Sequence, residues 1–433
     1  MEKKPIVIIE CISTSVNYIH DIIEEGYEPV LMELPVPVEQ QAMSRLFHDF
    51  CLKDLYLNLY PGAKPPRILQ ASEDYEETLE LVRKLDPVLV LPGGDDGVIL
   101  ATRLAHDLKL VSNDPRNLPK MRNKDVAQEM LKQNGVRSIR GISTTDLDEA
   151  LQFYHSIEDG RIVVKPNVGG ASVGVFICDD EETLRKAFER DLSETHEGNG
   201  DSAAVLLEEY IGGTEYFVNT VSCRGVHKVT GIMVEVKKQV PGGAPIYYSC
   251  DTVSPFSEAG KQLTDYAFKV LDAIGIEYGP VHSEFKIDEK GPVLIEANCR
   301  LCGTMMPAFY QDRIFGERES RVSLRSYLHP EQFLADPRSV LMDSEYKGII
   351  RILRINEERF VKRNKAGEVF RDLEGFEAAF GMGDNHLYPK TIDLSTASGL
   401  IFLAHKNRES LKHTLEIIDR IEAEEPERIY ECI

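Results

Sequence analysis

The sequence has few positive charges for its acidic content. Its 433 residues include 50 Lys and Arg against 72 Asp and Glu, a formal net charge of −22. A chain this acidic does not present a general binding surface for nucleic acid or for anionic membranes. Any anionic ligand must therefore be held by a local cluster of positive groups.

Long apolar runs are also missing. No stretch approaches the eighteen consecutive apolar residues that indicate a membrane-spanning helix. The N-terminal segment has a charged start, but its apolar run covers only residues 5–9, which is too short for a signal peptide. We therefore expect a cytoplasmic protein with no membrane segment.

Cysteine is sparse and lacks the spacing of a zinc site. Eight cysteines are scattered along the chain, and the one close pair, Cys299 and Cys302, is a lone CxxC without a second half. We interpret the cysteines as reduced thiols. The sequence assigns no role to this pair.

Two familiar nucleotide-binding signatures are absent. The turn after the first predicted strand, ECISTS, contains no glycine, which excludes the GxGxxG fingerprint of dinucleotide-binding folds. The glycine-rich stretch 167–175 ends without the GKS or GKT of a Walker A loop.

Strands and helices alternate over the first 115 residues. Residues 5–9 (PIVII) form a continuous β-branched run that is typical of a buried parallel strand. We predict a helix over 16–25, a strand over 29–32, a helix over 75–85 and a strand over 86–91, followed by the turn PGGDDG and a further helix. This alternation predicts a doubly wound parallel sheet, and the turn lies at the edge where ligands bind in such folds.

Two lysines and a glycine-rich loop suggest a phosphate site. Lys124 lies in the first turn of a predicted helix, where a cation is unfavourable against the helix dipole, so it suggests an external anion rather than a solvated basic face. Lys165 stands in the apolar strand 161–166, and a buried lysine needs a partner. The loop that follows contains Gly169, Gly170, Ser172 and Gly174. Such a loop can present successive backbone N–H groups to phosphate oxygens.

An acidic segment follows a polar linker. The apolar run 205–207 leads into Glu208 and Glu209, and Ile211 precedes two glycines. A strand that leaves its partner with a free backbone edge can hydrogen-bond an adenine, and Glu215 can hold a ribose diol. A surface hairpin with exposed acids fits the composition equally well.

The segment 282–303 contains the group of polar residues that most clearly indicates a functional site. It predicts a β-hairpin with strands over 281–287 and 293–297 and a turn between them. Glu296 and Asn298 are two residues apart and share a face, and pairing brings Glu284 beside them. Two carboxylates and an amide oxygen without a soft ligand suit Mg²⁺ or Mn²⁺. Each acid alone fits an ordinary solvated strand, but acids among apolar strands need a counter-charge, which a metal supplies.

In chain order these motifs resemble the ATP-grasp superfamily. The most specific element is E-x11-E-x-N-x-R, which runs from Glu284 through Glu296 and Asn298 to Arg300. The resemblance covers roughly residues 1–320. The chain length and the trailing α+β segment resemble the carboxylate–amine ligases of the L-amino acid ligase group, which make dipeptides.

The resemblance implies an ATP-grasp fold of mixed α/β and α+β class. We expect an N-terminal doubly wound parallel-sheet domain over 1–115 and a small ATP-grasp subdomain with the glycine-rich lid loop over 116–205. A subdomain for metal and ATP is expected over 206–330, and a C-terminal α+β module over 331–433.

The resemblance also implies roles for single residues. The implied ATP-binding residues are Lys124, Lys165, Gly169, Gly170, Ser172, Gly174, Glu208, Glu209, Ile211 and Glu215. The implied metal ligands are Glu284, Glu296 and Asn298, and Arg300 matches the arginine that stabilises an acyl phosphate. There are two departures. Glu209 stands where many relatives have a lysine, and Leu301-Cys302-Gly303 follows the arginine where relatives often carry more glycines.

The implied activity is an ATP-dependent ligation. ATP would phosphorylate a carboxylate with Mg²⁺ or Mn²⁺ bound, and an amine would attack the acyl phosphate to give an amide, ADP and phosphate. The alternatives are another ATP-grasp carboxylate-activating enzyme, of the nucleotide-biosynthesis or biotin-dependent type, and a non-catalytic nucleotide-binding protein. The sequence names neither small-molecule substrate and leaves the oligomeric state open, although a homodimer is common among the proteins it resembles.

Overall fold

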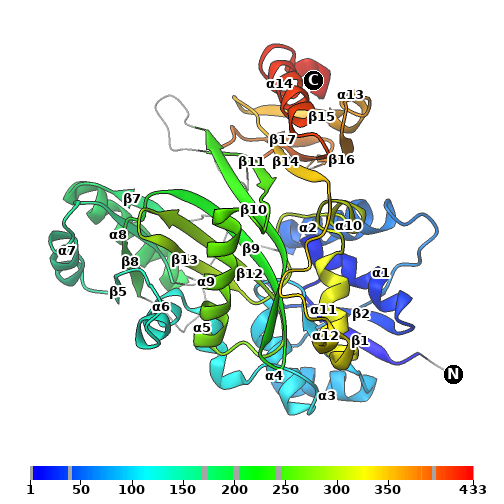
Figure 1. Ribbon diagram of the computed structural model, residues 1–433, viewed down its shortest axis with the longest axis horizontal. Helices are drawn as coiled ribbons and strands as arrows, with labels where there is room; N and C mark the ends of the chain where they lie inside the picture. The colour runs from blue at the N-terminus through cyan, green and yellow to red at the C-terminus, as the bar shows by residue number, and fades with distance from the viewer. Residues whose placement is uncertain are drawn as a thin grey trace.

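The structure is a computed structural model that describes residues 3–37, 41–167, 174–197, 204–238, 246–381, 383–392 and 396–432. The strands of these residues form four sheets (Figure 1). The parallel sheet lies on one side of the molecule, a small antiparallel sheet lies on the other, and a large antiparallel sheet runs between them. Among the described residues no helix combines the length and the apolar character needed to cross a membrane.

The N-terminal sheet is parallel, as predicted, with the strand order β3-β2-β1-β4. Its strands are β1 (Pro5–Ile9), β2 (Glu28–Glu33), β3 (Arg67–Gln70) and β4 (Leu89–Pro92), and its helices include α1 (Asn17–Glu24), α2 (Gln41–Leu52), α3 (Tyr75–Leu85) and α4 (Gly97–Asp107). Ile6 and Ile8 pack in a core with α1, whereas Val7 and Ile9 pack in a core with α3 and α4. The alternate residues of β1 thus bury both faces of the sheet, which explains its continuous apolar run.

The small antiparallel sheet has the order β5-β8-β6-β7. It consists of β5 (Gly141–Thr144), β6 (Ile162–Pro166), β7 (Phe176–Cys178) and β8 (Val205–Glu209), with α7 (Leu147–His155) and α8 (Glu181–Glu197) packed on it. Two helices precede it, α5 (Leu118–Arg122) and α6 (Lys124–Gln133). Lys120 and Arg122 lie in the short helix α5, which ends just before α6 begins at Lys124.

The large antiparallel sheet has eight strands in the order β13-β12-β9-β10-β11-β14-β18-β16. Its strands are β9 (Thr214–Cys223), β10 (Val226–Lys238), β11 (Ile246–Thr252), β12 (Gly279–Asp288), β13 (Gly291–Asn298), β14 (Lys347–Leu353), β16 (Phe376–Gly381) and β18 (Gly399–His405). The helix α9 (Glu258–Ile274) packs on it through the buried apolar side chains of Leu263, Ala267, Val270, Leu271 and Ile274. Three strands of the segment expected as a C-terminal module therefore extend the sheet that contains the 282–303 hairpin.

The remaining elements lie after the hairpin. They are α10 (Ala308–Phe315), α11 (Glu319–Leu328), α12 (Pro330–Ala335), β15 (Arg359–Asn364), α13 (Ala366–Val369), β17 (His386–Tyr388), α14 (Arg408–Glu424), α15 (Pro426–Ile429) and β19 (Tyr430–Cys432). The strands β17, β15 and β19 form the fourth sheet. The domain boundaries at residues 115, 205 and 330 stay predictions.

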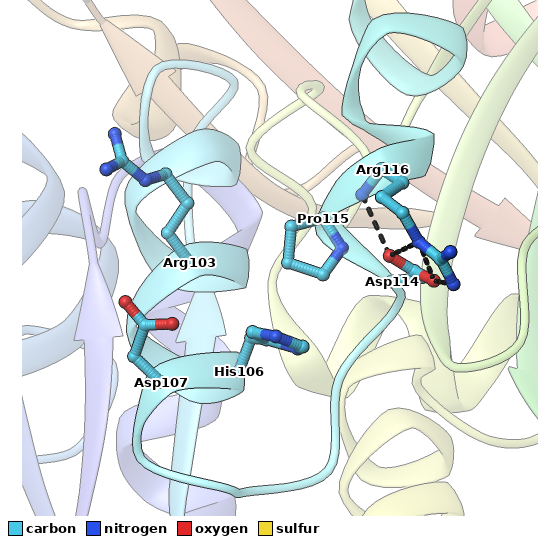
Figure 2. A pocket seen from close by; sticks show the side chains of 6 residues that line it. All are labelled: Arg103, His106, Asp107, Asp114, Pro115 and Arg116. Atoms are coloured by element: carbon cyan, nitrogen blue, oxygen red, sulfur yellow. Dashed lines mark hydrogen bonds and ion pairs between the residues drawn. The ribbon is translucent and has the colours of Figure 1, made fainter.

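A surface hollow of about 490 Å³ lies between α4 and the short helical turn Pro115–Asn117 (Figure 2). Its charged groups already have partners. Arg116 binds Asp114 through Nη2 and Nε, and Asp107 accepts a hydrogen bond from Tyr75 Oη at 2.6 Å. The Arg103 guanidinium lies over the Tyr75 ring, 4.1 Å from its centroid.

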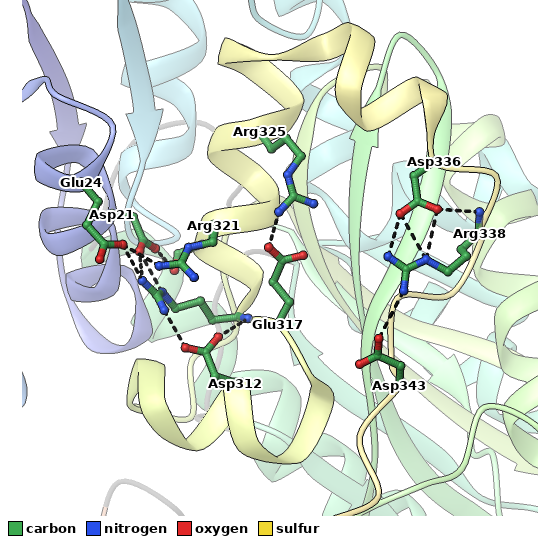
Figure 3. Close-up of polar contacts among 11 residues, drawn as sticks. Asp21, Glu24, Asp312, Glu317, Arg321, Arg325, Asp336, Arg338 and Asp343 are labelled. Atoms are coloured by element: carbon green, nitrogen blue, oxygen red, sulfur yellow. Dashed lines mark hydrogen bonds and ion pairs between the residues drawn. The ribbon is translucent and has the colours of Figure 1, made fainter.

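A buried ionic network fastens the parallel-sheet unit to the helices that follow the hairpin (Figure 3). Arg318, which is 5% exposed, binds Asp21 of α1 through Nε at 2.8 Å and Asp312 of α10 through Nη1 at 2.6 Å. Ser320 donates to the other oxygen of Asp21 at 2.6 Å. Removing one partner of a buried pair is costly, so this network fixes α1 against α10 and α11.

Candidate active site

The predicted hairpin exists and brings its acids together. Strand β12 pairs with β13 in a register that places Glu284 opposite Glu296 and His282 opposite Asn298. Directly opposed residues of an antiparallel pair lie on the same face. The side-chain amide of Asn298 donates to Glu296 Oε1 at 2.9 Å, which leaves its carbonyl oxygen as a potential ligand.

One lysine balances only part of this charge. Lys124 Nζ lies 3.1 Å from Glu296 Oε2, and the two side chains are 11% and 13% exposed. Burial alone would raise the pKa of Glu296, but the Lys124 ammonium and the Asn298 amide outweigh burial and lower that pKa. Burial and the carboxylates of Glu296 and Glu215 raise the pKa of Glu284 to about 8. Glu284 Oε1 lies 3.5 Å from His282 Nε2, and Lys124 is paired with Glu296 rather than with Glu284.

This donor set fits a magnesium ion that also binds phosphates. Among the described residues no group of three His, Cys, Asp or Glu side chains is arranged to hold a metal ion. Mg²⁺ is commonly bound by one or two carboxylates together with substrate phosphates rather than by an all-protein cage. Glu284, Glu296 and the Asn298 oxygen supply such a partial set, and a divalent cation would provide the charge that Glu284 lacks.

The buried lysine of β6 has a protein partner. Lys165 Nζ lies 2.6 Å from Glu208 Oε2, and these side chains are 6% and 3% exposed. The sequence explained the burial of Lys165 by a phosphate, but Glu208 alone already compensates its charge. Oε1 of Glu208 is buried and makes no hydrogen bond within the described residues. The ATP-binding roles of both residues stay predictions.

Of the glycine-rich stretch 167–175, only Asn167, Gly174 and Val175 are described. Gly169, Gly170 and Ser172 lie outside the described residues. Gly174 adopts a positive φ of 73° next to Pro166. The role of the loop as a lid stays a prediction.

The segment 208–215, called the hinge segment below, makes contacts with a backbone N–H group and with lysine side chains. Glu209 Oε1 accepts a hydrogen bond from the backbone N–H of Arg140 at 3.0 Å, and the carbonyl oxygen of Ile211 accepts one from Lys286 Nζ at 3.1 Å. Glu215 forms an ion pair with Lys237 at 2.8 Å and lies 3.8 Å from Lys286.

The sequence reasoning missed two groups beside Glu215. Glu235 of β10 lies opposite Glu215 in the sheet, and its Oε2 is buried without a hydrogen bond within the described residues. Burial, followed by the carboxylates of Glu284 and Glu215, raises the pKa of Glu235 well above its ordinary value. Lys286 lies opposite Glu215 on the other side. The signal was the polar alternation of Glu235 and Lys237 in an otherwise apolar strand.

Arg300 lies just beyond β13 and faces the parallel sheet. Its Nε and Nη2 donate to Asp95 Oδ2 at 3.0 and 2.6 Å. Asp95 belongs to the PGGDDG turn after β4, which the sequence analysis placed at the edge of the sheet where ligands bind. The structure thus places this turn next to Arg300.

Comparisons with known proteins agree with this geometry. Residues 159–308 match the family model described as ATP-grasp domain. The chain is 28% identical over 350 residues to dapdiamide A synthase of Enterobacter agglomerans, which covers 79% of this chain and 82% of that protein.

Two solved structures have the same fold. The L-amino acid ligase of Bacillus licheniformis superposes with a TM-score of 0.73 at 18% identity, covering 97% of this chain and 98% of that chain. The biotin carboxylase domain of a 2-oxoglutarate carboxylase from Hydrogenobacter thermophilus, solved with MgADP and bicarbonate, has a TM-score of 0.65 at 16% identity, covering 99% and 95%.

Residues 159–308 therefore match an ATP-grasp domain, and the predicted fold class is confirmed. The similarity to dapdiamide A synthase and to an L-amino acid ligase agrees with the expected ATP-dependent carboxylate–amine ligase of the amino acid ligase type.

Variants of Lys165 and Glu208 can distinguish a structural role of Lys165 from a role in ATP binding. We expect Lys165→Met to lower the free energy of unfolding by about 3–5 kcal/mol, because it leaves Glu208 buried and unpaired. The double variant Lys165→Met/Glu208→Gln removes both charges and should regain most of that stability, but it should not regain ATP affinity. Thermal unfolding and calorimetric ATP titration measure the two effects. Full ATP binding by the double variant would contradict a phosphate contact by Lys165.

Glu284 should make stability depend on pH. In the metal-free protein its pKa is about 8 against an ordinary 4.5, so the folded state keeps a proton that the unfolded chain releases. Stability should therefore fall as pH rises between these values. Glu284→Gln cannot titrate and should gain stability relative to the unmodified protein across this range. Melting temperatures in chelator check this, with Glu289→Gln in the exposed hairpin turn as the control. Parallel pH curves for the unmodified protein and Glu284→Gln would contradict the raised pKa.

Proposed function

We propose that this ligase phosphorylates the carboxylate of an amino acid with ATP and joins the acyl group to an amine, releasing ADP and phosphate. The observation that carries the proposal is the register of the hairpin, which sets Glu284, Glu296 and Asn298 on one face next to Lys124. Such a partial ligand set suits a metal ion whose coordination is completed by nucleotide phosphates. Arg300, two residues past the strand end, would supply the cation for an acyl phosphate.

The chain's own groups have distinct tasks in this reaction. Glu284, Glu296 and Asn298 would hold Mg²⁺ or Mn²⁺, which supplies charge neutralisation on the phosphates when bound. Lys124 and Lys165 would bind phosphate oxygens of the nucleotide. Arg300 would stabilise the negative charge that develops on the acyl phosphate as the amine attacks.

The nucleotide would lie along the hinge. Glu208, Glu209 and Ile211 are proposed to border the adenine and Glu215 to hold the ribose, with Gly169, Gly170, Ser172 and Gly174 closing over the phosphates. Closure matters because water hydrolyses an acyl phosphate. The ion pair of Glu215 with Lys237 fixes the Glu215 carboxylate for this contact.

The names of the similar proteins support an amino acid as the acyl donor. One is an L-amino acid ligase and another a dapdiamide synthase. We also propose a cytoplasmic protein and a homodimer; the former is supported by eight free cysteines, seven of them buried. A carboxylating enzyme, like the biotin carboxylase neighbour, is the second candidate, because that neighbour shares the fold over the whole chain.

Phosphate release from Mg-ATP tests the proposal. The purified protein is assayed against a pairwise matrix of the twenty amino acids and simple amines, with bicarbonate included as an acyl donor. We expect release that requires one particular acid and rises with one particular amine, and a Glu296→Gln variant that loses it. Glu289→Gln, in the turn of the same hairpin, is the matched control.

The outcome separates the candidates. Release stimulated by bicarbonate alone would favour the carboxylating enzyme. Uniform background across the matrix, with ATP still bound, would contradict the amino acid ligase and leave another carboxylate or a non-catalytic role.

A further inference from the structure

The turn that carries Asp95 is fixed against the end of β1. A Cβ atom on Gly93 would lie 2.4 Å from the carbonyl oxygen of Glu10, and one on Gly97 would lie 2.5 Å from that of Ile9. Both positions therefore tolerate only glycine without backbone movement. The two glycines let the turn pack directly on β1, which gives Asp95 a rigid base.

The Asp95 carboxylate accepts two hydrogen bonds from the guanidinium of Arg300. Its Oδ2 accepts from both Nε and Nη2 of Arg300, and Nη1 of Arg300 donates to the carbonyl oxygen of Leu301 at 3.0 Å. The Arg300 side chain is 13% exposed. Among contacts within the described residues, these bonds use three of the five N–H donors of the guanidinium, so two remain for another anion.

Further contacts hold the partners of this pair. Arg122 Nη1 donates to the backbone oxygen of Asp95 at 2.6 Å, which attaches the turn to α5. On the other side, Ser13 Oγ donates to the carbonyl oxygen of Gly303 at 2.8 Å and accepts from the backbone N–H of Met305 at 3.1 Å. Both the turn and the chain after Arg300 are thus held at the carboxyl edge of the parallel sheet.

We propose that Asp95 is the positioning residue for Arg300. Resting on the proposed function, the inference is that the parallel-sheet unit takes part in the chemistry by orienting the arginine that stabilises the acyl phosphate. A free arginine side chain samples many rotamers, and its charge is useful only where it is held toward the reacting group. Asp95 holds one edge of the guanidinium and leaves donors on the rest of it for the phosphate.

A double-mutant cycle distinguishes this role from a structural one. The four proteins are the unmodified enzyme, Asp95→Asn, Arg300→Ala and the double variant, and the readouts are kcat with the accepted acid and amine and KM for ATP. We expect Asp95→Asn to lower kcat on the order of 10-fold with KM for ATP unchanged, as for other groups that orient a functional side chain. Arg300→Ala should lower kcat on the order of 100-fold.

The decisive result is the effect of Asp95→Asn in the Arg300→Ala background. If Asp95 acts through Arg300, it should then cost nothing further; an equal loss in both backgrounds would show independent roles and overturn the inference. Asp96→Asn is the matched control, because the Asp96 side chain is 86% exposed and lies 3.9 Å from Arg122 rather than against Arg300.

The inference and the proposed function fail in different ways. Acid-stimulated phosphate release by the unmodified enzyme, together with an Asp95→Asn variant as active as Asp96→Asn, overturns the inference alone. Absence of acid-stimulated release from the unmodified enzyme overturns the proposed reaction and the positioning role with it.

Discussion

The site depends on two carboxylates that the sheet forces to face each other. Glu284 and Glu296 are directly opposed across the hairpin, and Lys124 balances only one of them. The strand register is fixed by the apolar residues that alternate with these acids, so the pair cannot separate without unpairing the hairpin. In the folded protein the two carboxylates therefore remain close together, and this arrangement is less unfavourable when a cation is bound beside them. Binding of a metal with nucleotide phosphates is the event that this arrangement favours.

Three parts of the chain converge on that hairpin. The small antiparallel sheet contributes the buried pair of Lys165 and Glu208, the large sheet contributes Glu215 and Glu235, and the parallel sheet contributes Asp95. The large sheet continues from the hairpin through β11 into β14, β18 and β16, so the C-terminal strands share one hydrogen-bonded framework with the edge that carries the proposed metal ligands. Each functional side chain is thus placed by a regular element or by a turn packed against one, which keeps their relative positions precise.

The sequence pattern predicted those elements whose structure is determined by residues close together in the chain. The buried run PIVII and the hairpin with Glu284 and Glu296 follow from periodicity and turn chemistry alone, and the structure confirms both. The contact of Arg300 with Asp95 joins residues 205 positions apart, and no periodicity contains that information. Similarly, Lys165 was correctly placed in a buried strand, but its partner Glu208 depends on how β6 pairs with β8. Glu235 was missed because its position opposite Glu215 results from the pairing of β10 with β9, which includes a register shift.

Oxygen transfer from the acid to phosphate is the most direct test of the central claim, that this site makes an acyl phosphate. The acyl donor is labelled with ¹⁸O in both carboxylate oxygens, and the phosphate released during turnover with Mg-ATP and the amine is examined by mass spectrometry. Attack of the carboxylate on the terminal phosphate of ATP places one labelled oxygen in each phosphate released, because aminolysis breaks the bond between the acyl carbon and that oxygen. Phosphate without label would mean that the carboxylate is not phosphorylated, and it would contradict the account.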